Sequence, residues 1–203
     1  MNNIFSKYFK CILLFTGCFS FYVNTNAQNW DINLLNNINP SNPNANFWVI
    51  TSNSLYPVSV ISPASILVTG FIKKDKILQQ KGWKALSTLV INSGITYGLK
   101  YTINRDRPYV KYPLIIYPYN IESSKSLPSG HTSTAFATAA SLSINFKKWY
   151  VVVPAYTWAA SVGYSRMYLG VHYPTDVFAG AIVGVGSAYL SHWLNKKIFP
   201  PKQ

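Results

Sequence analysis

The chain has 203 residues, of which 18 are Lys or Arg and 5 are Asp or Glu, so its net charge is +13, while 49% of the residues are hydrophobic and only 11% are charged. This length suits a single domain, and a charged fraction less than half of the ~25% usual in globular proteins argues against an ordinary cytosolic protein and against a disordered chain. The five acidic residues are too scattered for a two-metal site built from converging carboxylates. We therefore expect any hydrolytic chemistry to need neither a metal nor another cofactor.

The first 27 residues have the layout of a secretory signal peptide. Two lysines precede an apolar run over 11–23, and small residues follow up to Ala27, which predicts cleavage after Ala27. An uncleaved first transmembrane helix is the alternative, although the run is shorter than the about 20 residues that a span needs. Lipidation at Cys18 is a third interpretation. Both cysteines lie in this stretch, so they offer no disulfide framework to the rest of the protein.

The segment 24–46 is rich in Asn and contains Pro40 and Pro43, a composition typical of turns and exposed loops. Within it, 30–39 is expected to form one or two short amphipathic turns at a membrane surface. From there on, polar breaks separate apolar runs that contain no Asp, Glu, Lys or Arg and have the length of helices. These runs are 54–72, 85–99, 132–146, 149–164 and 177–194.

The charges between these runs favour membrane-spanning helices over the core helices of a soluble protein. If every run spans, most Lys and Arg residues fall in breaks on one side, which the positive-inside rule places in the cytoplasm. The lysines then act as topology signals, so we expect no nucleic-acid partner. The sequence thus predicts an all-α protein, a helical bundle of five to six membrane-spanning helices, while the many Ser and Thr residues in short runs keep a soluble bundle as the alternative. In the last run, Gly180, Gly184 and Ala188 recur every four residues and predict the close approach of another helix.

Three segments on the opposite, non-cytoplasmic side contain nearly all residues able to carry out chemistry. They are 100–108 (KYTINRDRP), 128–132 (PSGHT) and 165–176 (SRMYLGVHYPTD). In the first, Lys100 and Arg107 are seven residues apart, which is two helical turns, so they can reach the same side of a helix end. The second leads into a helix, whose first backbone N–H groups form a ready anion site.

The third segment places His172 and Asp176 four residues apart, so the carboxylate can bond one imidazole nitrogen and leave the other free. Together the segments supply three cations, a helix N-terminus and two imidazoles, a set that suits a dianionic phosphate group. Phosphoryl transfer asks a protein mainly to position groups and to neutralise charge. One imidazole can then be the nucleophile and the other the general acid.

At these residues the sequence resembles a known family. The pattern K-x6-RP, then PSGH, then SR-x5-H-x3-D is similar to that of the type 2 phosphatidic acid phosphatase (PAP2) superfamily, which also contains bacterial class A acid phosphatases and vanadium haloperoxidases. The resemblance implies an all-helical bundle with six spans in the membrane branch. It also implies a phosphomonoesterase that uses no metal and works through a phosphohistidine, with 28–203 as its domain.

The resemblance also implies a role for each matching residue. His172 would attack phosphorus, Asp176 would hold the tautomer of its ring, and His131 would protonate the leaving oxygen and later act as base. The phosphoryl oxygens would be bound by Lys100, Arg107, Ser129, Gly130 and Arg166. Five charged residues close to the motifs receive no role beyond contact with substrate: Arg105, Asp106, Lys111, Glu122 and Lys125. His192 matches no motif and is interpreted as an interfacial or packing residue.

The short motif spacing and the lysine-rich loops look most like the membrane lipid phosphatases of the superfamily. The expected partners are therefore the membrane and a phosphorylated lipid such as phosphatidate, phosphatidylglycerol phosphate, undecaprenyl pyrophosphate or lipid A, entering sideways from the outer leaflet. The site would face the periplasm from the inner membrane. The alternatives are a soluble periplasmic acid phosphatase, a vanadate-dependent haloperoxidase and a non-catalytic membrane scaffold. The sequence does not specify the lipid or the oligomeric state.

Overall fold

The computed structural model describes residues 25–198, and every regular element in that range is a helix. The prediction of an all-α fold is therefore confirmed. From Asp31 onward the described residues belong to one compact unit, which contains nearly all of the described structure. The predicted signal peptide or first transmembrane helix lies, apart from its last three residues, outside the described part of the chain. The helices are α2 (Thr25–Ile38), α3 (Asn46–Asn53), α4 (Leu55–Ile72), α5 (Lys76–Ile103), α6 (Pro108–Lys111), α7 (Gly130–Phe146), α8 (Trp149–Tyr168) and α9 (Pro174–Ile198).

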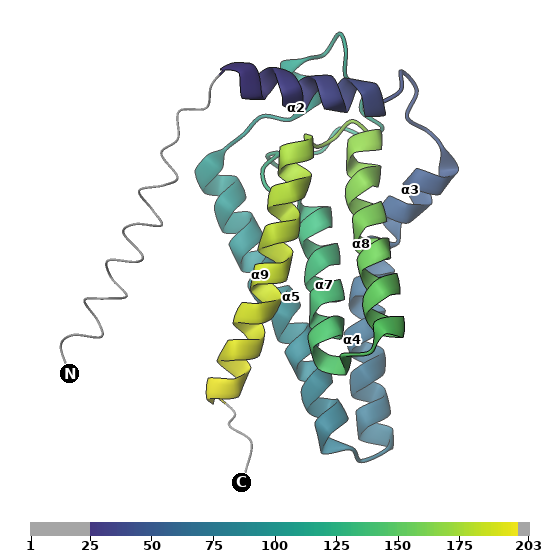
Figure 1. Cartoon of the computed structure of the whole chain (residues 1–203), viewed down its shortest axis with the longest axis vertical. Coiled ribbons are helices and arrows are strands. Elements are labelled where there is room, and N and C mark those ends of the chain that lie inside the picture. Colours follow the sequence, from purple (N-terminus) through teal and green to yellow (C-terminus); the bar gives the residue numbers. More distant parts are fainter. Residues whose placement is uncertain (1–24, 199–203) are drawn as a thin grey trace, which may run out of the picture. The chain divides into compact units, whose positions relative to one another are not determined.

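Helix α7 is the central element of the bundle. It packs against α4, α5, α8 and α9, and α4 packs against α5 (Figure 1). The side chains of α7 that face its neighbours are small and fully buried, including Ala135, Ala137, Ala139 and Ala140. Because these side chains are short, the surrounding helices can approach the α7 backbone closely.

Helices α7 and α9 pack closely against each other. A Cβ atom added at Gly184 would lie 2.2 Å from the carbonyl oxygen of Ser133, and one added at Gly180 would lie 2.7 Å from that of Ser129. Ala188, one turn further along α9, is also buried. The close helix approach predicted from the four-residue spacing of small residues is confirmed.

Replacement of Gly184 by Val is expected to destabilise the bundle by about 1–3 kcal/mol, because the new side chain must push the α7 backbone away. The matched control is Gly186→Ala in the same helix, where an added Cβ meets nothing within 4 Å. That change should be neutral or stabilising by up to about 1 kcal/mol, because Ala has the higher helix propensity. Thermal unfolding in detergent measures both variants, and equal melting temperatures would contradict the tight α7–α9 contact.

Three helices extend beyond their apolar runs and so carry polar residues to one end of the bundle. Helix α5 continues to Ile103 and includes Lys100, α8 continues to Tyr168 and includes Arg166, and α9 begins early enough to include Asp176. Asn104 ends α5 in the left-handed conformation, with φ of 53°, and its N–H bonds the carbonyl of Lys100, as Asn often does at helix ends.

The segment predicted as a loop over 24–46 is helical over Thr25–Ile38, so this prediction is wrong for that part of the chain. The physical reason is that Ile32 and Leu35 lie one turn apart and are buried, forming a cluster whose other members are Tyr109, Ile116, Leu169, Val171 and Tyr173. Asn39 then joins this segment to two others, because its Nδ2 donates to the carbonyls of Tyr117 and Tyr168, each at 2.9 Å. Many Asn residues remain on the surface, but two apolar residues and one buried amide fix the helix.

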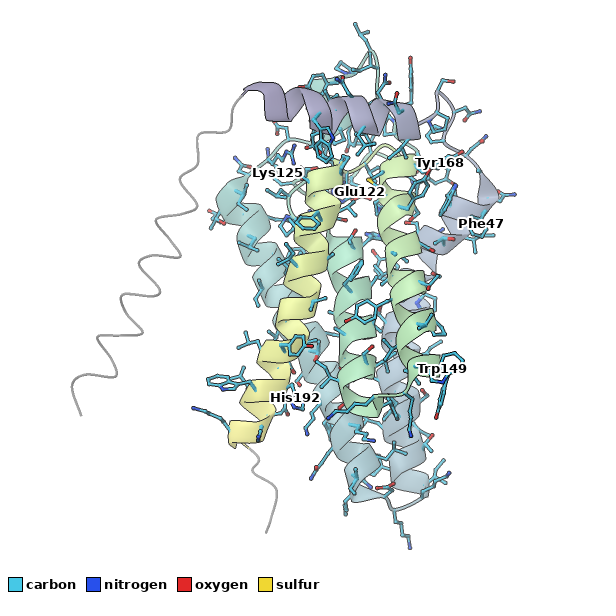
Figure 2. The ribbon with its side chains drawn as sticks, in the orientation of Figure 1. Phe47, Glu122, Lys125, Trp149, Tyr168 and His192 are labelled. Atoms are coloured by element: carbon cyan, nitrogen blue, oxygen red, sulfur yellow. The ribbon has the colours of Figure 1, made fainter. Side chains whose placement is uncertain are left out.

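Two helical stretches within residues 25–198 are long and apolar enough to cross a membrane, Asn46–Ile72 and Pro174–Lys197. Large apolar side chains point outward from α4, α5 and α9, among them Val60, Phe71, Val90, Phe178 and Ile182. Figure 2 shows Phe47 and Trp149 projecting outward towards opposite ends of the bundle, and both side chains are exposed. Many exposed apolar side chains on helices of this kind favour contact with lipid or with another protein.

Candidate active site

A cavity of about 350 Å³ lies among the helix ends that carry the three motifs. Five of the residues singled out from the sequence line it: Lys100, Arg107, Gly130, His131 and His172. The two histidines therefore share one cavity, although they are 41 positions apart in the chain. In Figure 2, Glu122, which also lines the cavity, lies near one end of the bundle, and His192 lies near the other.

The other three residues singled out from the sequence, Ser129, Arg166 and Asp176, are buried and do not line the cavity. The Ser129 hydroxyl oxygen accepts hydrogen bonds from N–H and Oγ1 of Thr132, at 3.4 and 2.9 Å, so it caps the start of α7. Arg166 donates to Oγ of Ser52 at 2.6 Å and is paired with Glu122. Asp176 lies next to His172.

His172 is held between Arg107 and Asp176. Its Nε2 lies 3.3 Å from Nη1 of Arg107, and its Nδ1 lies 3.5 Å from Oδ2 of Asp176. Because a guanidinium can only donate hydrogen bonds, Nε2 is the unprotonated nitrogen and Nδ1 carries the proton facing the carboxylate. The Nδ1–Oδ2 distance is at the outer limit of a hydrogen bond, and Nδ1 has no other partner among the described residues. A shift of a few tenths of an ångström would complete this bond.

The cations of the site are fixed by backbone carbonyls. Arg107 donates from Nε to the carbonyl of Ser124 and from Nη1 to that of Val171, both at 2.8 Å. Lys100 donates to the carbonyls of Lys125 and Ser126. With Arg166, these cations are buried to 7% exposure or less. Buried cations require compensating anions, so the cavity is suited to a negatively charged ligand.

Glu122 supplies such an anion, although the motifs assign it no role beyond contact with substrate. Its carboxylate bridges the two arginines, with Oε2 2.7 Å from Nη2 of Arg107 and Oε1 bonded to Nη2 of Arg166. Burial alone would raise the pKa of Glu122, but Arg166 and Arg107 outweigh it and hold this pKa below its usual value. No spacing pattern could have predicted this, because Glu122 lies in an irregular loop 44 positions from Arg166.

Asp31 and Arg105 also belong to the site, although sequence reasoning gave them no catalytic role. Arg105 donates from Nη1 to Oδ1 of Asp176 at 2.6 Å and from Nη2 to Oδ2 of Asp31 at 2.8 Å. Asp31 in turn accepts from the N–H and Oγ1 of Thr175, at 3.0 and 2.6 Å. The motifs contain no signal for Asp31, because it contacts a residue 144 positions away.

The two histidines are neutral in the free site at neutral pH. Burial lowers the pKa of His172 to about 4, assisted by Arg107 and opposed by Asp176. Burial, followed by the charge of Arg166, lowers the pKa of His131 to about 3. His131 immediately precedes the apolar run 132–146 and so lies outside that predicted span. Within residues 25–198, no three His, Cys, Asp or Glu side chains are grouped so that they could hold a metal ion.

The structure is an all-α bundle, and its helix ends enclose two histidines and several buried cations. The three motifs imply this arrangement. Residues 81–200 match the model of the PAP2 superfamily. Since this match covers more than half of the chain, the protein belongs to the PAP2 superfamily, and the family membership predicted from the motifs is confirmed. The match includes all three motif segments but neither Asp31 nor Ser52.

The relatives of this chain include proteins named as a lipid A phosphatase and as an undecaprenyl-diphosphatase. The chain is 32% identical over 114 residues to the lipid A 1-phosphatase of Porphyromonas gingivalis, which is 55% of this chain and 23% of that protein. It is 34% identical over 110 residues to the undecaprenyl-diphosphatase of Sulfolobus acidocaldarius, covering 51% and 52% of the two chains. The chain thus spans between about a quarter and a half of the length of these relatives. The crystal structure of LpxE from Aquifex aeolicus superimposes with a TM-score of 0.62 at 25% identity, covering 86% of this chain and 97% of that one.

Proposed function

We propose that the protein is a membrane phosphatase that removes phosphate from a phosphorylated lipid through a phosphohistidine on His172. The observation that carries this proposal is that His131 and His172 line one cavity together with Lys100 and Arg107. In the first step, Nε2 of His172 attacks phosphorus, the Nε2–P bond forms, and the bond from phosphorus to the lipid oxygen breaks. The substrate binds as its phosphate monoanion and passes its proton to His131, which gives that proton to the leaving oxygen.

In the second step, a water molecule attacks the phosphorus of the phosphohistidine while His131 takes the proton from the water. The Nε2–P bond breaks, inorganic phosphate leaves with the proton that His131 took from the water, and His172 returns to its neutral form with the proton on Nδ1. Asp176 stabilises the imidazolium-like ring in both transition states. Lys100, Arg107 and Arg166 neutralise charge on the phosphoryl oxygens, assisted by the N–H groups at the start of α7 around Gly130.

The cavity also supports a lipid substrate, because it extends from the charged end into an apolar region between α4 and α5. Leu55, Tyr56, Val60 and Leu89 line this part, and Val60 lies at the apolar outer surface of α4. A phosphate held by the cations would therefore direct its acyl chains towards the surface that faces lipid. We place this end of the bundle on the periplasmic side of the inner membrane, because the lysine-rich loops at the other end favour the cytoplasm.

The test uses the purified full chain in detergent with four substrates: phosphatidate, phosphatidylglycerol phosphate, undecaprenyl pyrophosphate and lipid A. We expect phosphate release from at least one, with no loss when a chelator is added, and retention of the protein in membranes washed without detergent. If no lipid phosphate is hydrolysed, or if the chelator abolishes release, the proposal fails. Release of the protein into the wash would favour the soluble phosphatase.

Glu122 occupies the place between Arg107 and Arg166 that the phosphoryl oxygens would take, so it must leave when substrate binds. Its side chain is 27% exposed, against 3% and 6% for its arginine partners, so it can turn towards solvent. We expect Glu122→Gln to lower the inhibition constant for inorganic phosphate about 3- to 10-fold, because the competing charge is gone. Asp106→Asn, which changes an exposed carboxylate paired with Lys125, is the control. Weaker phosphate inhibition in Glu122→Gln would contradict this role.

The pH dependence follows from the two neutral histidines. His172 must be neutral to attack, and its pKa of about 4 means that activity is lost only as pH falls through that value. Since His131 is also neutral in the free site, the proton for the leaving group arrives with the substrate, whose phosphate monoanion loses it near pH 6. We therefore expect kcat/KM to be highest between about pH 4 and 6. An acidic limb at or above pH 6.5 would contradict the buried, neutral His172.

A further inference from the structure

We propose that Asp31 and Arg105 are positioning residues that keep Asp176 ionised and aligned with His172, an inference that rests on the proposed function of His172 as nucleophile. Neither residue touches the cavity, and Asp31 lies outside the part of the chain that matches the family model. Their effect on catalysis would therefore be transmitted through Asp176.

The geometry places one guanidinium between two buried carboxylates. Arg105 donates to Oδ1 of Asp176 at 2.6 Å and to Oδ2 of Asp31 at 2.8 Å, and both carboxylates are almost fully buried. Because Arg105 holds Oδ1 of Asp176, the other oxygen, Oδ2, is directed to Nδ1 of His172, Oγ of Ser126 and the N–H of Tyr173. The ring of Tyr173 covers Arg105, with 3.9 Å from the guanidinium carbon to the ring centroid.

The charges explain why two acids share one base. The trio carries a net charge of −1, so Asp176 keeps enough negative charge to attract the proton on Nδ1 of His172. If Arg105 were lost, two buried carboxylates would remain without a counter-ion, and one of them would take up a proton. If Asp31 were lost, Arg105 would neutralise Asp176 alone and weaken its hold on His172.

Helix α2 is thereby part of the active site. Asp31 on α2 binds Thr175, the residue next to Asp176, through both its N–H and its hydroxyl. Arg105 also donates to this hydroxyl at 2.7 Å, so the start of α9 is fixed from two sides. A purely structural role for Asp31 and Arg105 is the competing explanation, and the two explanations differ in what happens when both residues are changed together.

The experiment is a double-mutant cycle with Arg105→Gln, Asp31→Asn and the combined variant, assayed on a soluble aryl phosphate. We expect Arg105→Gln to lower kcat about 100-fold with KM changed less than about threefold, because phosphate binding is intact. The combined variant should have a kcat about tenfold higher than that of Arg105→Gln, because removing the second carboxylate restores the net charge of −1. The activity of Arg105→Gln alone should also rise at higher pH, where the extra proton leaves.

Thermal unfolding of each variant, and of the control Lys76→Gln at the exposed far end of α5, completes the test. If the losses of the two single variants simply add, or if kcat follows the melting temperature across the set, Asp31 and Arg105 are structural and the proposal is overturned. Asp31→Asn changes no side-chain volume, so it tests the proposal even if Arg105→Gln fails to fold: a fall in kcat with an unchanged melting temperature supports it, and an unchanged kcat overturns it. Activity remaining in His172→Ala would instead show that the proposed function itself is wrong.

Discussion

Replacement of His172 by Asn is expected to lower kcat at least about 10⁴-fold, the largest effect of any single change in the chain. Asn can keep a hydrogen bond but cannot form the Nε2–P bond, so no phosphoenzyme can arise. The measurement is phosphate release from both a lipid phosphate and an aryl phosphate. The loss should be equally severe for both, because the nucleophile is needed whatever the leaving group.

His131→Asn is the matched comparison, and its effect should depend on the leaving group. A lipid alcohol needs a proton to leave, whereas a nitrophenolate does not. With p-nitrophenyl phosphate, this variant should still form the phosphoenzyme and then stall, since His131 is also the base for the attacking water. Rapid mixing should show a burst of about one nitrophenolate per active site. Equal losses without a burst in both histidine variants would contradict the division of roles.

Arg107→Lys is expected to have the second largest effect, lowering kcat/KM about 10²- to 10³-fold although the charge is kept. Arg107 uses three nitrogens at once, because it contacts Ser124, Val171 and Glu122 while Nη1 also lies against Nε2 of His172. A lysine ammonium offers a single nitrogen at the end of a flexible chain. It can neutralise a phosphoryl oxygen but cannot also fix the tautomer of His172.

The control for this charge-conserving change is Lys76→Gln, which removes an exposed charge at the opposite end of α5 from Lys100. Its kcat/KM should stay within about twofold of the wild-type value, because exposed charges far from the site contribute little. Circular dichroism and the melting temperature of Arg107→Lys show whether the loop around Ser124 is intact. A variant with native stability and near-native kcat/KM would show that Arg107 serves only as a point charge.

The helices of the bundle could be predicted because each contains an uninterrupted apolar run. The runs 54–72 and 132–146 lie within one or two residues of the bounds of α4 and α7. The other three runs are shorter than their helices, because polar residues continue a helix without contributing to apolar periodicity. Two runs end before Lys100 and Arg166, the last begins after Asp176, and α5 also begins nine residues before its run, at Lys76. Helix α2 was missed because its stability depends on contacts made by Ile32 and Leu35 with distant loops, and not on its Asn-rich composition.

The motif residues could be predicted because their spacing is local, whereas the residues that join the motifs could not. His172 and Asp176 are four positions apart, and such a pair is visible in any sequence. Glu122 and Asp31 act across the fold, and only the three-dimensional structure brings them to Arg166 and Arg105. The hydroxyl oxygen of Ser129 caps α7, which leaves its O–H free to donate, so phosphate binding by Ser129 stays a prediction.

The most direct measurement of the central claim is a structure of the full chain with orthovanadate, which mimics a phosphoryl group during transfer. We predict vanadium bonded to Nε2 of His172, an apical oxygen facing the imidazole of His131, the remaining oxygens on Lys100, Arg107 and Arg166, and Glu122 turned away from both arginines. Vanadate bound away from His172, or a His131 side chain directed out of the cavity, would contradict the proposed mechanism.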